Sequence, residues 1–265
     1  MPDSATQSVR FEYAMRSDAG RVRAHNEDFC IANAELGVFA VCDGMGGAAA
    51  GEIASRVAAE TLVSCLQKGS LLREKSTRER AAEAIVCANR AVYSRARSSA
   101  LRGMGTTVVA LFTTPCVQPS GDTPAMPLKA GTVTVAHVGD SRCYRLRGGQ
   151  LQRLTADHSL VAEQIRIGDL TEEQAASSPL RNVITRAVGT RSSVEPEIVD
   201  WNAKPGDLYL LCSDGLTRDL TNDQISVILQ HYSTNLDDAA QALLDEANDH
   251  GGEDNITCLL VRCSV

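Results

Sequence analysis

The sequence predicts an α+β fold in which antiparallel β-sheets are covered by helices. Short apolar runs bounded by Gly, Pro, Asn or Asp recur along the chain, which is typical of buried strands. Two such runs flank Gly148–Gly149, the pattern of a β-hairpin. Amphipathic segments occur as two sequence pairs, within residues 53–92 and within residues 221–249. Hairpin-linked strands and paired helices favour sheets with helices on their faces.

The first half of the chain is expected to hold five strands and one pair of helices. Apolar positions on one helical face mark the first helix at residues 53–66, and the capping box of Ser76 and Glu79 starts the second. Residues 114–131 contain four prolines and predict an exposed hairpin loop. The expected strands are residues 10–15, 29–32, 38–42, 108–112 and 132–138.

In the second half, a hairpin is followed by an insertion and then by further strands and helices. Residues 159–180 carry two short helical pieces around Gly168–Asp169, and we expect them to form a flap over the surface. Thr221 and Gln224 form another capping box. The other expected elements are strands at residues 141–146, 151–154, 182–189, 208–212 and 256–262, and helices at residues 160–167, 171–176, 221–231 and 236–249.

Length and composition favour one domain, residues 10–265, preceded by a disordered segment at residues 1–9. The net charge of −7 argues against electrostatic binding to nucleic acid. No apolar run approaches the length of a membrane span, and residues 1–20 lack the apolar core of a signal peptide, so we expect a cytoplasmic protein with no membrane partner. The nine cysteines form no C-x-x-C pair, so buried reduced thiols are expected.

Four acids lie at the ends of expected strands. Asp43 and Asp214 each follow an apolar run and precede a glycine, Asp140 follows Gly139, and Asp254 precedes the last strand. Such carboxylates are hard oxygen ligands, which suit Mg²⁺, Mn²⁺ or Ca²⁺ better than Zn²⁺. Asp is also a common turn residue, so spacing alone leaves both a metal centre and a set of ordinary turns open.

Seven motifs stand in order along the chain. They are Arg21-Val-Arg-Ala-His-Asn-Glu-Asp28, Asp43-Gly-Met-Gly-Gly47, Gly103-Met-Gly-Thr-Thr107, Val138-Gly-Asp-Ser-Arg142, Asn182-Val-Ile-Thr-Arg186, Ser213-Asp-Gly-Leu-Thr217 and Gly252-Glu-Asp-Asn255. In this order they resemble the protein phosphatase 2C family, most closely its compact bacterial members, over about residues 10–263. The resemblance implies a metal-dependent serine/threonine protein phosphatase. It also implies a four-layer α-β-β-α sandwich of two antiparallel sheets flanked by helix pairs, with the metals at one end.

The resemblance assigns roles to the acids of these motifs. Asp43 matches a catalytic acid that bridges two metals, and the carbonyl of Gly44 matches a further ligand. Asp214 and Asp254 match the remaining ligands of one metal. Two metals that share a water can activate it for in-line attack on phosphorus, so no protein nucleophile is needed.

The remaining roles concern the second metal, a third metal and the substrate. Glu27 and Asp28 match the acidic pair beside the other metal, and Asp140 matches an acid of a weaker third metal. Arg23 matches the catalytic arginine that binds the substrate phosphate. The implied cofactors are two or three Mn²⁺ or Mg²⁺ ions. Asp140 as a turn cap or a partner of Arg142, and Arg23 as a surface ion pair, stay open as alternatives.

Two departures from the family pattern bear on the chemistry. Met45 stands where some relatives have a histidine proposed to protonate the leaving group, so the general acid is unassigned. Arg218 stands where some relatives have an acid that helps to bind the third metal. The third-metal site is therefore an open question.

The leading hypothesis is an active, monomeric phosphatase that acts on phosphorylated proteins, including a serine/threonine kinase whose action it opposes. A pseudophosphatase that binds phosphoproteins is one alternative, and loss of a core aspartate would favour it. A hydrolase of small phosphoesters is the other, and a deep narrow pocket would favour it, whereas a shallow open cleft suits protein substrates.

Overall fold

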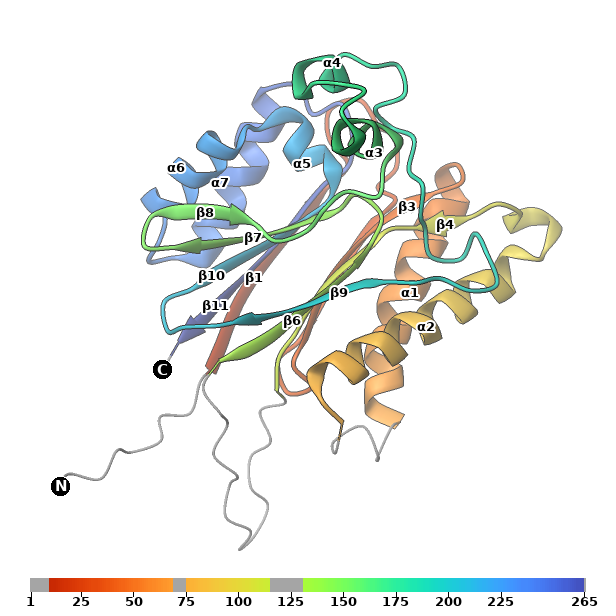
Figure 1. Cartoon of the computed structure of the whole chain (residues 1–265), viewed down its shortest axis with the longest axis horizontal. Coiled ribbons are helices and arrows are strands. Elements are labelled where there is room, and N and C mark those ends of the chain that lie inside the picture. Colours follow the sequence, from red (N-terminus) through yellow and green to blue (C-terminus); the bar gives the residue numbers. More distant parts are fainter. Residues whose placement is uncertain (1–9, 69–74, 115–130, 265) are drawn as a thin grey trace, which may run out of the picture.

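Two antiparallel sheets pack face to face, and helices cover their outer faces (Figure 1). The computed structural model describes residues 10–68, 75–114 and 131–264. The five-stranded sheet contains β1 (Arg10–Asp18), β11 (Ile256–Ser264), β10 (Leu208–Cys212), β7 (Arg142–Arg147) and β8 (Gln150–Arg153), in this order. The six-stranded sheet contains β2 (Asp28–Asn33), β3 (Val38–Met45), β5 (Val108–Phe112), β6 (Thr132–Val138) and β9 (Glu197–Asn202), with β4 (Gly105–Thr106) beside β3. The predicted α+β sandwich is confirmed.

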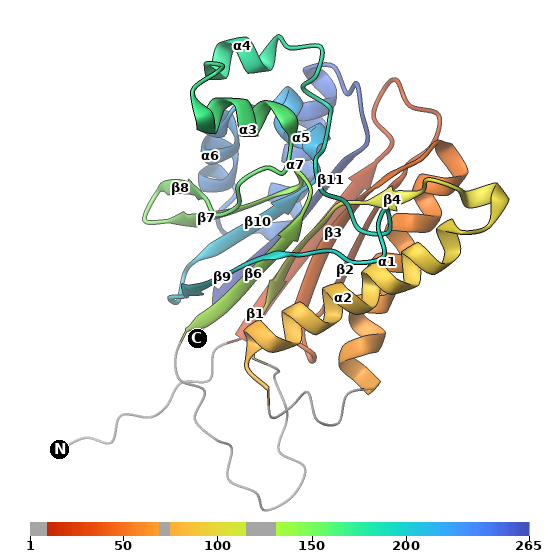
Figure 2. The ribbon, with the colours of Figure 1, turned by 45° about the vertical axis from the view of Figure 1, so that its right-hand side comes forward.

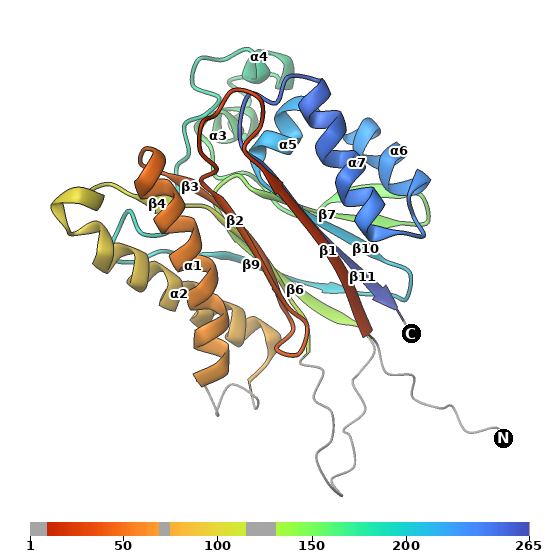
Figure 3. The same cartoon turned by 180° about the vertical axis from the view of Figure 1, so that it is seen from behind.

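Apart from the short helices of residues 159–180, the helices form two groups, one on each side of the sandwich (Figure 3). On the six-stranded sheet lie α1 (Ala48–Lys68) and α2 (Thr77–Ala96), with the 3₁₀ turn η2 (Ser99–Leu101) after α2. On the five-stranded sheet lie α5 (Asp214–Asp219), α6 (Asn222–His231) and α7 (Leu236–Asp249). Both predicted capping boxes are present, Ser76 with Glu79 and Thr221 with Gln224. The expectations for residues 1–9 and for most of the 114–131 loop fall outside the described residues.

Strand β3 shows why a central strand of this fold is apolar at successive positions. Phe39 and Val41 lie in the layer between the sheets, where Tyr209 of β10 also packs. Ala40 and Cys42 belong instead to the core between this sheet and helices α1 and α2. Because both faces of β3 are buried, alternation with polar residues is absent and the strand is held rigidly up to Asp43.

The insertion forms two short helices, α3 (Leu160–Ile167) and α4 (Glu172–Ala176), as predicted. Ser159 caps α3, and Gly168 ends it in the left-handed conformation with a φ of +85°. Figure 2 shows both helices projecting from one end of the sandwich. Residue His158, just before α3, is bonded through its backbone to Gly139, so the insertion starts next to Asp140.

The predicted strand at residues 182–189 is wrong. Within this stretch, Ile184 and Val188 each form a single isolated bridge, to Ser159 and Thr106, and no ladder follows. The edge of β6 is occupied by β9, which was not predicted because its sequence mixes charged and apolar residues and is half exposed. Helix α5 was also not predicted, and it begins at Asp214 itself.

Candidate active site

Acids from both sheets line one cleft of about 320 Å³. Asp43 lies near the end of β3, Asp140 follows β6, Asp214 follows β10 and Asp254 precedes β11. Strands β3 and β6 run parallel with β5 between them, and β10 is antiparallel to β11, so these four strand termini meet at one end of the sandwich. The other predicted site residues that line the cleft are Arg23, Glu27 and Gly44.

The backbone of Asp43 is fixed by two threonines of the Gly-Met-Gly-Thr-Thr motif. The Asp43 N–H donates to Thr107 Oγ1 at 3.0 Å, and the Asp43 carbonyl accepts from the Thr107 N–H and from Thr106 Oγ1, both at 2.8 Å. Burial raises the pKa of Asp43 well above its usual range, and the nearby Asp28 and Asp214 raise it further. A rigid, charge-crowded carboxylate of this kind requires a proton or a cation.

Two glycines allow α1 to lie directly against the backbone at Gly44 and Glu27. A Cβ at Gly44 would lie 2.1 Å from the carbonyl oxygen of Gly51 and 2.5 Å from that of Glu27. A Cβ at Gly51 would lie 1.7 Å from Glu27 Oε2. The first turns of α1 therefore form one wall behind Glu27.

Asn255 holds the loop that carries Glu27. Its Oδ1 accepts from the Glu27 N–H at 2.8 Å, and its Nδ2 donates to the carbonyls of Ala19 and His25 at 3.1 and 2.9 Å. Ser55 Oγ of α1 donates to the Glu27 carbonyl at 2.6 Å. Asn255 thus supports the turn that carries Glu27, and burial raises the pKa of Glu27.

Asp28 lies behind the cleft and faces Asp43 across the β2–β3 ladder. Its side chain is buried, and neither carboxylate oxygen has a hydrogen-bond partner among the described residues. Burial raises the pKa of Asp28 to about 7; the nearby Thr257 and Ser213 hydroxyls act against this rise, and the Asp214 and Asp254 carboxylates add to it. A buried carboxylate without partners is costly unless a proton or a cation neutralises it.

Asp140 stands on the opposite side of the acids, next to the base of the flap. Burial raises its pKa to about 7, and the charges of Asp214 and Asp157 act in the same direction. Arg142 donates to Asp157 at 2.7 Å rather than to Asp140. The alternative in which Arg142 is the hydrogen-bonded partner of Asp140 therefore has no support in the geometry.

Two arginines reach the acids. Arg23 is half exposed, and its Nη2 lies 3.0 Å from Asp254 Oδ2. Arg218, on α5, donates to Asp214 Oδ2 at 2.5 Å and to Asp254 Oδ2 at 2.9 Å. The contacts of Arg218 were not predicted, although its position one helical turn after Asp214 would have indicated them had α5 been recognised.

The donor set fits hard divalent cations. The acids supply carboxylate oxygens, Gly44 supplies a backbone carbonyl, and no cysteine or histidine lies among the described residues that line the cleft. Burial raises the pKa values of Asp28, Asp43 and Asp140, and the neighbouring carboxylates raise them further. Met45 also lines the cleft, so the position at which some relatives have a histidine carries no acidic side chain here.

A histidine cluster lies at the base of the flap, beside the acids. His137 and His158 stack at 4.6 Å between ring centroids, and Glu197 lies 3.5 Å from His158 Nε2. The Gly139 N–H donates to His158 Nδ1, and the Arg186 guanidinium lies 3.3 Å from His158 Nε2. Burial lowers the pKa of His137 and lowers that of His158 to about 4, and the cluster joins β6, β9 and the start of the flap.

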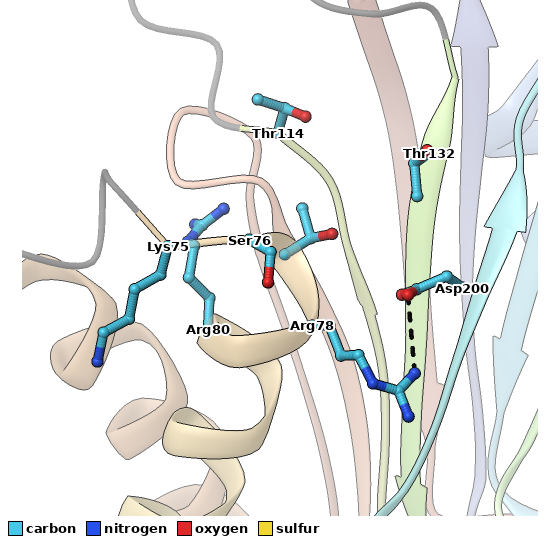
Figure 4. A pocket seen from close by; sticks show the side chains of 8 residues that line it. Lys75, Ser76, Arg78, Arg80, Thr114, Thr132 and Asp200 are labelled. Carbon is cyan, nitrogen blue, oxygen red and sulfur yellow. Dashed lines mark ion pairs between the residues drawn. The ribbon is translucent and has the colours of Figure 1, made fainter.

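A second cavity, of about 420 Å³, lies beside the start of α2 (Figure 4). Of the described residues that line it, three are basic (Lys75, Arg78 and Arg80), and the one acid, Asp200, pairs with Arg78 at 3.7 Å. Arg80 is buried and donates to the backbone carbonyls of Thr113 and Leu36, so it ties α2 to the sheet. This cavity contains none of the predicted site residues.

Comparisons with known proteins agree with the geometry. The family model described as "Protein phosphatase 2C" matches residues 19–250. The serine/threonine phosphatase stp of Listeria monocytogenes is 36% identical over 258 residues, which cover 93% of this chain and 94% of that protein. The crystal structure of the Mycobacterium tuberculosis serine/threonine phosphatase PstP/Ppp superposes with a TM-score of 0.83 at 33% identity, covering 97% of this chain and 100% of that one. A catalytic-domain structure of PstP, similar at a TM-score of 0.81 and 32% identity over 97% of this chain and 100% of that one, is a complex with two manganese ions.

Proposed function

This chain belongs to the protein phosphatase 2C family, and from that premise we propose that its acid-lined cleft removes phosphate from phosphoserine and phosphothreonine in proteins. The observation that carries the proposal is the cleft itself, which Asp43, Asp140, Asp214 and Asp254 line from both sheets, with the buried carboxylate of Asp28 directly behind Asp43. We further propose that residues 10–265 act as one phosphatase domain.

The proposed metal ligands are Asp43, Gly44 through its carbonyl, Asp214 and Asp254, with Glu27 and Asp28 beside the second ion. Bound Mn²⁺ or Mg²⁺ would supply an activated water and positive charge for phosphoryl transfer. Hydrogen bonds between Asp43 and both Thr106 and Thr107, and from the Glu27 N–H to Asn255, already hold the backbone of these ligands in place before an ion binds. Asp140 is proposed as a ligand of a weaker third ion.

Arg23 is proposed to bind the phosphate of the substrate. Its side chain lines the cleft and is 52% exposed. Its guanidinium forms an ion pair with Asp254, so it already lies beside the acids of the cleft. A planar guanidinium can bind two phosphate oxygens at once, which orients the phosphorus for in-line attack.

Protein substrates suit this site better than small phosphoesters, and a pseudophosphatase is not favoured. The cleft is open, with the half-exposed Arg23 at its mouth, and each acid of the seven motifs is present. We propose that the substrates include a serine/threonine kinase and that the enzyme acts as a cytoplasmic monomer. Separately, none of the described helices is both long enough and apolar enough to cross a membrane.

The experiment that tests the function is hydrolysis of a phosphothreonine peptide by the full chain with Mn²⁺, with and without a chelator. Wild type should turn over only with the metal, and Asp43→Asn should lose about two to three orders of magnitude in kcat. Arg23→Ala should raise KM while Mn²⁺ binding, followed by calorimetry, survives. Asp237→Asn, an exposed acid on α7, is the matched control and should behave as wild type. Full activity of Asp43→Asn in excess chelator would refute the assignment.

A further inference from the structure

Arg218 places a positive charge directly on two of the proposed metal ligands. It is the fifth residue of α5 and stands one helical turn after Asp214, so its guanidinium reaches back over the start of the helix. Its Nη2 lies 2.5 Å from Asp214 Oδ2, and its Nη1 lies 2.9 Å from Asp254 Oδ2. The side chains of all three residues are at least partly buried, with exposed fractions between 18% and 26%. Charge-assisted contacts screened from solvent in this way are among the stronger hydrogen bonds in proteins.

The acids of the cleft therefore fall into two classes. Asp254 is fully engaged, because its Oδ2 accepts from both Arg218 and Arg23 and its Oδ1 accepts from the Asn255 N–H at 2.9 Å. Asp28, by contrast, has no hydrogen-bond partner for either oxygen among the described residues. Arg218 therefore balances the negative charge of Asp214 and Asp254 but leaves that of Asp28 without a contacting cation among the described residues.

We propose that Arg218 is a built-in counter-cation that competes with divalent metal ions for Asp214 and Asp254. It stabilises the metal-free fold and lowers the affinity of the cleft for Mn²⁺ or Mg²⁺. The inference rests on the proposed roles of Asp214 and Asp254 as metal ligands. An ion approaching these oxygens meets a like charge that already occupies them, so the bonds of Arg218 must be given up as the ion binds.

The contact of Arg218 with the end of the flap indicates where the displaced side chain can go. Its Nη2 also lies 3.4 Å from Asn182 Oδ1, a long contact with another residue that lines the cleft. The amide oxygen of an asparagine is uncharged, yet it can accept a hydrogen bond from a guanidinium N–H. Arg218 can therefore leave the carboxylates and keep a polar partner.

The test measures Mn²⁺ affinity by calorimetry on chelator-stripped full-length protein, and thermal unfolding of the same samples in chelator. Arg218→Gln removes the charge and keeps a polar side chain. It should bind Mn²⁺ at least about tenfold more tightly than wild type, the order expected for loss of one partly buried charged competitor. Its metal-free Tm should be several degrees lower, because Asp214 and Asp254 then lose the guanidinium that contacts both of them. Arg16→Ala, which removes the arginine of an ion pair of the same 2.9 Å length to Asp237, is the control and should leave Mn²⁺ affinity unchanged.

Equal or weaker Mn²⁺ binding by Arg218→Gln would overturn the proposal. If that variant yields no folded protein, Arg218→Lys decides in its place. Lysine keeps the charge but loses the two-pronged contact, so tighter binding than wild type supports competition, and equal or weaker binding overturns it. Because both readouts are independent of turnover, a wild-type enzyme that binds Mn²⁺ but fails to hydrolyse phosphopeptides would refute the proposed function and leave this inference standing.

Discussion

At the scale of single residues, the buried carboxylates explain how the cleft responds to protons and to metals. Asp28 and Asp140 have pKa values raised to about 7, in each case first by burial. An acid whose pKa is raised in the folded state binds more protons folded than unfolded between the two pKa values. In the metal-free protein these groups favour the fold at low pH and oppose it once they ionise.

We predict that the free energy of unfolding in chelator falls as the pH rises from about 4 to about 7, measured by denaturant titration. Asp28→Asn, which cannot ionise, should flatten this slope and raise metal-free stability at pH 8. The same variant should bind Mn²⁺ more weakly, because a carboxylate near the ions is lost. Asp237→Asn should keep the wild-type slope, and a slope that Asp28→Asn leaves unaltered would contradict the assignment.

At the scale of elements, the flap is tied to the cleft by its return segment. Glu163 of α3 accepts a hydrogen bond from Thr185 Oγ1 at 2.9 Å, and Ile184 bridges Ser159 at the start of the flap. Asn182 and Ile184 line the cleft. The segment expected as a strand thus serves to connect the flap with the acids, and a flap at this place can contact a substrate that extends beyond the phosphate.

We predict that Glu163→Ala lowers kcat/KM for a phosphothreonine peptide more than for a small aryl phosphate, since only the peptide is large enough to touch the flap. The measurement is a ratio of two specificity constants on one enzyme preparation, so errors in active fraction cancel. Glu172→Ala, an exposed residue of α4, is the control within the same segment. Equal losses on both substrates would show that the flap does not select them.

The α1–α2 pair has its own chemical feature. Cys65 and Cys87 are free thiols with sulfurs 2.9 Å apart, and both are half-buried. We predict that an added thiol oxidant such as diamide links them in a disulfide. The diazene takes up the two thiol protons and two electrons and becomes a hydrazine. The link should raise Tm by about 5 °C or more, because it restrains the unfolded chain. Mass spectrometry of the non-reduced digest checks the link, Cys87→Ser should abolish the shift, and a shift that survives in Cys87→Ser would assign it to other cysteines.

At the scale of the whole molecule, elements with a local sequence pattern could be predicted, whereas elements that depend on long-range contacts could not. Buried strands such as β3 and helices with capping boxes were predicted because their patterns are local. Strand β9 was missed because it gains order only by pairing with β6, and residues 182–189 were assigned wrongly because their apolar residues pack without a ladder. The convergence of the acids was expected from the family resemblance, whereas the bonds of Arg218 depend on α5 and on tertiary contacts.

The last prediction concerns the two sheets together. Asp43 belongs to the six-stranded sheet, whereas Asp254 lies two residues before β11 of the five-stranded sheet, so an ion held by both would join the two halves of the sandwich. A ligand that binds only the folded state stabilises it by about 2.7 kcal/mol at one hundred times its Kd. Saturating Mn²⁺ should therefore raise Tm by about 5 °C or more relative to chelator, measured by calorimetry. Asp43→Asn and Asp254→Asn should each reduce that rise, although they change different sheets, and Asp237→Asn should retain it. If only one of these two substitutions reduced the Mn²⁺-dependent increase in Tm, the ion would stabilise one sheet and would not join the two sheets.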